Sequence, residues 1–316
     1  MLTVRKNLEL TSQILSSSIQ FMKSLVIPDF PSGSSINFYD GNLHLIGDDA
    51  TNILVLDLSY QKIGSIQLYE SEEKRIPKAD KTDLEGSTIL KIDDVPHLLI
   101  VGSASRKNRK SIIVIPFSSH GVDLKTLKRS FHSTRAFIKR VKSQGIEEVN
   151  IEGICAVREI LLLGNRGNRS SQNNHLIITD YNFWEHQNDA RLLIRKLSIP
   201  ATHTNDILGL SELCYIQAVD MLLITLTSEA VDNAYDDGAI GDSYIGWIND
   251  ASVKLKAHEL KINKIINLAD VNTVFKKEKI EGICVESVTT SEVVLHLISD
   301  NDAGESGLFK IKLSLS

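Results

Sequence analysis

Carboxylate side chains recur in this chain in patterns that suit a divalent cation. Three glutamates, Glu85, Glu152 and Glu281, each precede a glycine in a similar context. Other acidic residues directly follow short apolar runs, as in Asp48-Asp49. Carboxylate and amide oxygens are the ligands that Ca²⁺ and Mg²⁺ prefer. We therefore predict that Ca²⁺ or Mg²⁺ binds to a set of acidic residues that comprises Asp48, Asp49, Glu281, Asp300 and Asp302.

Basic and amide side chains point to a second chemistry, the binding of an anion. They gather in the segment 74–81 and in the loop 165–169. Lys and Arg hold carboxylate and phosphate groups through charge-assisted hydrogen bonds. Two of the recurring glutamates, Glu85 and Glu152, are predicted to belong to the same site. The predicted ligand-binding set is Lys78, Lys81, Glu85, Glu152, Asn165, Arg166 and Arg169.

These residues are carried by five copies of one pattern. Three copies contain the three cysteines and two have a hydroxyl instead; they begin at Ile151, Leu210, Ile280, Leu84 and Pro31. Each copy is followed by further apolar runs and, in most cases, by an alternating segment such as 191–197 or 253–256. Short runs rich in Ile, Val and Leu between Gly, Asp, Asn and Ser are typical of β-strands. Four strands per copy, at a period of roughly 60 residues, predict the blades of a β-propeller.

The closure of the ring is also predicted from the pattern. The fifth copy ends at 307–313 without a fourth strand, whereas residues 2–10 alternate like an outer strand. We expect residues 2–10 to complete the last blade, because closure removes exposed sheet edges. The predicted fold is an all-β, five-bladed β-propeller that forms one domain over residues 1–316. A sixth blade within 11–31 or 120–144 is the alternative; both segments, like 265–277, are better interpreted as connections with some helix.

A propeller would bring the two predicted sets of residues together. The innermost strand of a blade begins, and the second strand ends, at the same face, so both sets should lie on one rim of the central channel. The loops after the second strand are acidic in blades one, four and five and basic in blades two and three. We expect a split rim, with a cation on the acidic arc and an anion on the basic arc. Three glutamates around one narrow axis repel each other, and Lys81 and Arg166 are their expected partners.

Composition excludes several classes of protein. The chain has 316 residues, of which 42% are hydrophobic and 24% charged, which is typical of a folded protein. Its net charge of -5 argues against a general nucleic-acid binder. No run approaches the roughly 18 apolar residues that span a membrane, and the N-terminus lacks the apolar core of a signal peptide. We expect a cytoplasmic protein that does not bind nucleic acid or a membrane.

Several short motifs together resemble one known family. They are the segment 81–86, the later Ile-Glu-Gly copies, and the closing segments 299–302 and 307–311. This combination resembles the phytase-like, or esterase-like, bacterial β-propeller proteins, many of which have no assigned function. The resemblance covers most of the chain. It implies the propeller fold and makes a metal-assisted phosphoester hydrolase a candidate activity.

Two functions are therefore carried forward from the sequence. In the first, an uncharacterised β-propeller binds a small anionic ligand, with a divalent cation, on one rim of the channel. If the cation activates water, this protein acts as a metal-assisted phosphoester hydrolase. The alternative is a non-catalytic interaction module whose protein partner lies on the same rim. The sequence assigns no catalytic residue.

Overall fold

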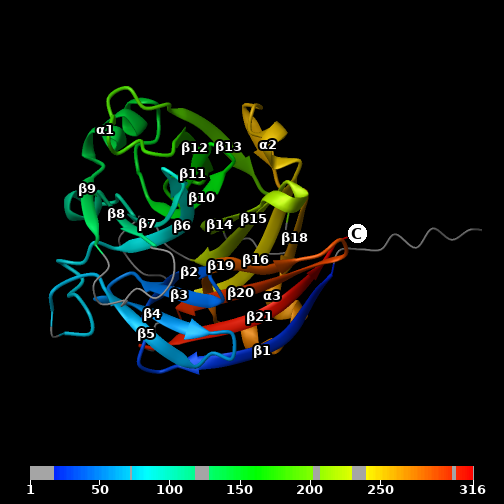
Figure 1. Cartoon of the computed structure of the whole chain (residues 1–316). Coiled ribbons are helices and arrows are strands. Elements are labelled where there is room, and N and C mark those ends of the chain that lie inside the picture. Colours follow the sequence, from blue (N-terminus) through cyan, green and yellow to red (C-terminus); the bar gives the residue numbers. More distant parts are fainter. Residues whose placement is uncertain are drawn as a thin grey trace, which may run out of the picture.

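The computed structural model describes residues 18–71, 73–117, 128–201, 207–229, 240–300 and 304–315. Their strands form five sheets that follow one another around a common axis in chain order (Figure 1). The protein is thus the predicted all-β, five-bladed β-propeller, and the alternative prediction of a sixth blade is wrong. Within the four main strands of each blade, neighbouring strands pair antiparallel, as expected for short connections.

Each blade runs from an innermost strand at the axis to an outermost strand at the periphery. Blade one contains β2 (Gly33–Tyr39), β3 (Asn42–Gly47), β4 (Asn52–Asp57) and β5 (Lys62–Gln67). Blade two contains β6 (Leu84–Ile92), β7 (Val95–Gly102), β8 (Ser111–Pro116) and β9 (Ser130–Ser133). Blade three contains β10 (Ile151–Val157), β11 (Ile160–Asn165), β12 (Asn174–Asp180) and β13 (Leu193–Ser198). Blade four contains β14 (Leu208–Ile216), β15 (Met221–Glu229), β16 (Ile240–Asn249) and β18 (Lys264–Asn267).

Blade five is closed by a strand from the beginning of the chain. It contains β19 (Lys279–Val288), β20 (Glu292–Asp300), β21 (Ser306–Ser314) and, as its outermost strand, β1 (Ile19–Ile27). Figure 1 shows β1, in blue, lying beside β21, in red. The predicted mode of closure is confirmed, but the expectation that 11–31 is a connection with some helix is wrong over β1. Ile19 and Phe21 pack against the core of blade five, which explains why this segment pairs. The predicted strand 2–10 lies outside the described residues.

The outer strands of three other blades differ from the prediction. In blade two, the outer strand β9 lies within 120–144, which was expected to be a connection with some helix. The segment 253–256 does not form the outer strand of blade four, because residues Ala251–Lys254 form helix α2. Ala251 and Leu255 are buried between blades three and four, and β18 takes the outer position instead. The short strand β17 (Glu259–Lys261) then adds to blade three, parallel to β13. The buried residues Ala251 and Leu255 are four apart, which is the spacing of one face of a helix and not the alternation of a strand.

The remaining connections carry short helices. Helix α1 (Arg135–Ser143) follows β9 and buries Phe137, Ile138 and Val141 between blades two and three. Helix α3 (Leu268–Val271) follows β18, and the 3₁₀ turns are Lys107–Arg109, Gln217–Val219 and Thr273–Phe275. None of the helices in the described part of the chain is long and apolar enough to cross a membrane.

The core consists of layers between adjacent blades. Leu98, Leu99 and Ile100 are consecutive in β7, and all three are fully buried, because sheets cover both faces of the strand. Five such hydrophobic clusters follow one another around the ring. This packing fixes the five innermost strands against each other, and these strands position the site.

Candidate functional site

The same β-bulge interrupts each innermost strand near its beginning. The pairing with the second strand shifts by one residue between Leu84 and Gly86, and equivalent shifts occur in all five blades. A bulge leaves one residue unpaired and redirects its side chain. The unpaired residues are Ser34, Glu85, Glu152, Ser211 and Glu281, and we call them the bulge ring. In blade one the sequence pattern aligned Gly33 with Gly86, but the structure aligns Ser35 with it.

The residues that follow the bulge ring lie where neighbouring innermost strands approach each other closely. They are Ser35, Gly86, Gly153, Glu212 and Gly282, and we call them the throat. A Cβ atom on Gly153 would lie 2.8 Å from the Cα atom of Glu212, and one on Gly282 would lie 2.8 Å from the Cα atom of Ser35. Neighbouring backbones therefore approach too closely for a side chain at these two positions.

Glu212 fills the throat with its carboxyl group. Its Oε1 atom accepts hydrogen bonds from the backbone N–H groups of Ile154 and Leu213, both at 2.9 Å. Its Oε2 atom accepts a hydrogen bond of 2.6 Å from the hydroxyl of Ser35. Since these partners belong to blades three, four and one, the side chain spans the channel. Burial raises the pKa of Glu212 well above its usual value, against the effect of the hydrogen bonds.

The mouth of the channel lies on the side of the throat where the innermost strands begin. There Lys81 forms ion pairs with Asp48 and, at 2.9 Å, with Asp83, which also binds Arg109 at 2.6 Å. Asp48, Asp83 and Glu85 each place a carboxylate oxygen within 4.8 Å of the other two. Burial raises the pKa of Asp48 to about 7, although Lys81 opposes this shift. Burial and the nearby Glu152 raise the pKa of Glu85 well above its usual value.

The other half of the mouth contains two more glutamates with cationic neighbours. The guanidinium of Arg166 lies 3.9 Å from the carboxylate of Glu152, and Lys279 lies 2.8 Å from Glu281. Arg166 also donates hydrogen bonds to Thr227 at 2.8 Å and to Ser211 at 3.1 Å. Burial raises the pKa of Glu152 to about 7, although Arg166 opposes this shift. The mouth is thus a compact set of interleaved acidic and basic groups.

The structure brings some of the predicted residues together and separates others. Those at the mouth are Asp48, Lys81, Glu85, Glu152, Arg166 and Glu281. Asn165 is buried beneath them, where its side chain accepts a hydrogen bond from the backbone of Asn150. Asp49 binds Arg75 at 2.7 Å and does not take part in the carboxylate cluster. Lys78 and Arg169 are exposed and Asp300 is half-buried, each outside that cluster, and Asp302 lies outside the described residues.

Four residues of the channel were missed by the sequence prediction: Asp83, Arg109, Glu212 and Lys279. A signal existed for two of them, because Asp83 and Lys279 each precede a bulge-ring glutamate by two residues. Residues two apart in a strand point to the same face. Arg109 and Glu212 carry no comparable signal. Arg109 lies in a 3₁₀ turn after β7, and Glu212 occupies a position where three other blades have glycine.

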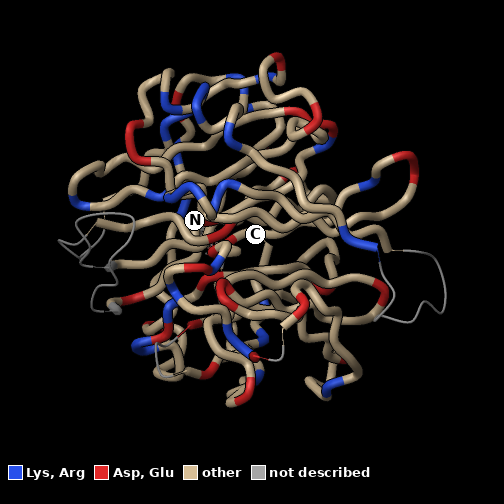
Figure 2. Tube along the Cα trace, turned by 90° about the vertical axis from the view of Figure 1, so that its left-hand side faces the viewer, with Lys and Arg blue, Asp and Glu red and all other residues tan. Residues whose placement is uncertain are grey.

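The predicted division of charge between two arcs is not reproduced at the mouth. Blade two, expected to be basic, contributes Asp83 and Glu85, and blade five, expected to be acidic, contributes Lys279. Figure 2 shows positions of both signs throughout the trace. The arcs were predicted from the loops after the second strands alone, whereas the mouth combines residues of those loops, such as Asp48 and Arg109, with residues at the start of the innermost strands, such as Glu85. The acidic loop 230–239 of blade four lies outside the described residues.

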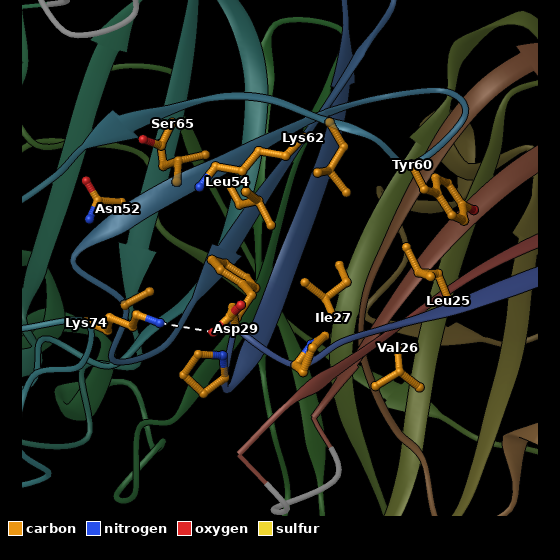
Figure 3. Close-up of a pocket in the computed structure, with 16 residues that line it drawn as sticks. Leu25, Val26, Ile27, Asp29, Asn52, Leu54, Tyr60, Lys62, Ser65 and Lys74 are labelled. Carbon is orange, nitrogen blue, oxygen red and sulfur yellow. Dashed lines mark hydrogen bonds and ion pairs between the residues drawn. The ribbon is translucent and has the colours of Figure 1, made fainter.

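A second hollow lies away from the channel, at the periphery between blades five and one. This groove has a volume of about 530 Å³ and is lined by β1, β4 and β5 (Figure 3). Leu25, Val26 and Leu54 give it an apolar wall, and Lys74 forms an ion pair of 3.0 Å with Asp29 at its edge. The groove has no cluster of ionisable groups comparable to the mouth among its described residues, so the mouth is the better candidate site.

Comparison with known proteins identifies a family, and one solved structure, a glutaminyl cyclase, supports the fold. The model of a family of unknown function, DUF6929, matches residues 29–313. No curated protein matches the chain. A crystal structure of glutaminyl cyclase from Myxococcus xanthus is 11% identical, with a TM-score of 0.53 over 95% of this chain and 98% of that one. The tail fibre of Staphylococcus aureus phage P68 is 9% identical, with a TM-score of 0.49 over 94% of this chain and 53% of that one. None of these three descriptions mentions a phytase, so that resemblance stays a prediction.

Proposed function

The chain belongs to the family of unknown function DUF6929, and we propose that its channel mouth binds a divalent cation, Ca²⁺ or Mg²⁺, which in turn holds a small anionic ligand. The observation that carries the proposal is the cluster of Asp48, Asp83 and Glu85, whose carboxylates lie within 4.8 Å of one another. Oxygen ligands at this spacing suit a hard cation. The cation site predicted from the sequence is proposed again with a changed set of ligands: Asp48 stays, and Asp83 and Glu85 replace Asp49, Glu281, Asp300 and Asp302.

The hydrogen bonding of the cluster leaves room for a ligand. The Oδ1 atom of Asp48 is buried and has no hydrogen-bond partner among the described residues, while its Oδ2 atom binds Lys81. The carboxylate of Glu85 forms no hydrogen bond or ion pair with any described residue. A buried polar atom without a partner costs about 1–3 kcal/mol, so a bound cation would relieve a real penalty. The residues present fit a cation in this respect.

The charge balance of the mouth also favours a cation over a free anion. When all five carboxyl groups are ionised, at a pH above the raised pKa values of Asp48, Glu85 and Glu152, they exceed the cationic groups by one. The groups that face each other are Asp48, Asp83, Glu85, Glu152 and Glu281 on one side and Lys81, Arg109, Arg166 and Lys279 on the other. Lys81 and Arg166, which the sequence predicted to bind the anion, already bind groups of the protein. We infer that an anion is held through the cation, with Lys81 and Arg166 adding attraction at longer range.

This arrangement would support hydrolysis of a phosphoester. A divalent cation supplies polarisation of the ester and a lower pKa of water. Glu152 is the candidate general base, because its pKa of about 7 lets it accept a proton near neutral pH. Arg166, beside Glu152, would hold a negatively charged oxygen. The proposed catalysis requires the proposed binding of the cation, whereas binding of the cation does not require catalysis.

The binding proposal is tested by isothermal titration calorimetry with CaCl₂ and MgCl₂. Glu85→Gln should weaken binding about tenfold or more, because it removes one charged ligand. The matched control is Asp29→Asn, which removes the same charge from an exposed carboxylate 86% accessible to solvent. Asp29→Asn should leave the affinity within about twofold. Absence of binding by either cation at millimolar concentration would overturn the proposal.

The anion is tested with inorganic phosphate on the protein with and without MgCl₂. Phosphate should bind only when Mg²⁺ is present. Binding without Mg²⁺ would show that Lys and Arg hold the anion directly, against the proposal. If neither probe binds, the alternative function, a protein-interaction module using the same rim, takes its place.

A further inference from the structure

We propose a second binding site at the opposite end of the channel, a chamber that takes a small organic anion carrying an aromatic ring. The chamber has a volume of about 540 Å³. It is lined by the parts of the innermost strands that follow the throat, such as Asn37, Thr88 and Ala156. Its size is that of pockets for small molecules, which range over about 300–1,000 Å³. This site is separate from the proposed cation site.

The throat separates the chamber from the mouth. Glu212 binds groups of blades one, three and four, and glycines of blades two, three and five bring the backbones together around it. The hydroxyl of Ser87 lies 2.7 Å from that of Ser35 and accepts a hydrogen bond from Asn37 at 2.5 Å. Ser87 and Asn37 therefore form a polar floor above the closed throat, and a ligand would enter from the far side.

The walls combine small polar groups with aromatic rings. Cys155, Cys214 and Cys284 line the chamber on three successive blades. Tyr181 and Tyr215 are half-buried at its rim. Aromatic rings contribute about 0.5–1.5 kcal/mol to a ring–ring contact beyond area burial, which favours a ligand with a ring of its own. The floor offers hydroxyl and amide groups to its polar substituents.

The chamber differs from the mouth in its charges, because the mouth contains both acidic and basic groups. Lys91 and Arg158 line the chamber, whereas none of its described lining residues is an aspartate or a glutamate. The nearby Asp220 accepts hydrogen bonds from Tyr215 at 2.8 Å and from Ser252, so its carboxylate is engaged outside the lining. A cationic rim above a partly apolar chamber selects an anion with an apolar body.

The cysteines act here as walls rather than as nucleophiles. Burial raises the pKa of Cys155 and of Cys284 well above the usual value and that of Cys214 to about 12. A neutral thiol packs as a small apolar group and reacts slowly. Because all three cysteines of the chain line the chamber, their slow reaction with a thiol reagent reports on this site alone.

The test uses 8-anilinonaphthalene-1-sulfonate as the probe, with its fluorescence as the readout of binding. Lys91→Glu should weaken binding about fivefold, as reversal of one charge at an exposed rim predicts. The matched control is Lys62→Glu, the same reversal at an exposed lysine of the peripheral groove. Lys62→Glu should leave the affinity unchanged. The uncharged N-phenyl-1-naphthylamine should bind more weakly than the sulfonate.

A second readout locates the probe. The reaction of 4,4′-dithiodipyridine with the native protein is followed over hours at pH 8.5, with mass spectrometry to identify the modified cysteine. Saturating sulfonate should slow the reaction of Cys214, the half-buried thiol, by about fivefold or more. Weaker binding by Lys62→Glu than by Lys91→Glu would overturn the proposal. Equal binding of the uncharged probe, or absence of sulfonate binding, would overturn it as well.

Discussion

The hydroxyl of Ser35 in the first blade donates a hydrogen bond of 2.6 Å to the carboxyl group of Glu212 in the fourth blade. The two residues occupy equivalent positions in their blades, and three other blades have glycine there. The bond crosses the channel. A side chain therefore closes the channel at these two positions, whereas backbones lie close together at the three glycines. Because of this closure, the channel has two separate ends, the mouth and the chamber, whose side chains differ in chemistry.

We expect Glu212→Gln and Glu212→Ala to differ sharply in stability. The glutamine can accept the same backbone N–H bonds and donate to Ser35, so its cost at pH 7 should be below about 1 kcal/mol. The alanine leaves two buried N–H groups without an acceptor and should cost about 2–5 kcal/mol. Urea unfolding measures both values. Equal unfolding midpoints for the two variants would show that Glu212 does not bridge the blades.

Stability should fall as pH rises, because buried carboxyl groups of the mouth have raised pKa values. Glu152 has a pKa of about 7 in the folded protein and an ordinary value of 4.5. Its folded-state preference for the proton stabilises fully below about pH 4.5 and is lost as pH rises through 7. Glu152→Gln should therefore flatten the dependence of the unfolding free energy on pH between 4.5 and 7. The measurement is urea unfolding across this range, and an unchanged slope would contradict the assignment.

Binding of the cation should depend on pH in the opposite sense. Asp48 has a pKa of about 7, and that of Glu85 is raised, so protons compete with the cation below neutral pH. Affinity for Ca²⁺ should be at least about tenfold lower at pH 5.5 than at pH 8. Calorimetry in two buffers of different ionisation enthalpy should detect proton release on binding. An affinity that does not change with pH would place the cation away from these two carboxylates.

Asp83→Asn should be strongly destabilising, because Asp83 pairs with two buried cations. Arg109 is only 3% exposed, and its guanidinium lies 2.6 Å from the carboxylate of Asp83. Lys81 lies 2.9 Å from the same carboxylate, so the substitution removes a charged partner from both cations. Breaking a buried ion pair from one side costs about 3–5 kcal/mol. The control is Glu292→Gln, whose partner Lys312 lies 3.1 Å away on a more exposed surface. That change should cost less than about 1 kcal/mol. Chemical unfolding that gives similar costs for both variants would count against the buried network.

Close approach of the blades at the throat predicts a cost for Gly153→Ala. Its added Cβ atom would lie 2.8 Å from the backbone of Glu212, so adjacent blades must move apart. We expect a loss of about 1–3 kcal/mol, as for overpacking of a tightly packed site. Gly41→Ala is the control, because its Cβ would meet open space and only a positive φ of 79° opposes the change, at about 1 kcal/mol. A thermal midpoint that falls equally in both variants would contradict a tight throat.

Much of the fold could be predicted from the sequence because it depends on local pattern. Apolar runs of fixed length recur with the blades, and the runs 43–46, 98–101 and 160–163 all lie within second strands. Their residues are buried on both faces, which leaves a strong signal. Outer strands carry a weak signal, since water covers one face. The outer strands β1, β9 and β18 were therefore missed, and helix α2 was predicted as a strand.

The amino-acid sequence was sufficient to predict the number of blades, the order of their inner strands and the closure of the ring by the N-terminal part of the chain. It also predicted that Glu85, Glu152 and Glu281 share one end of the channel. The sequence did not predict which charges pair there, and the three-dimensional arrangement was needed to see that Lys81 joins Asp48 to Asp83 and that Glu212 closes the channel. The physical reason is that strand periodicity is a property of neighbours along the chain. Ion pairs and hydrogen bonds across the axis depend instead on distances of a few ångströms between blades, which bulges and backbone packing set.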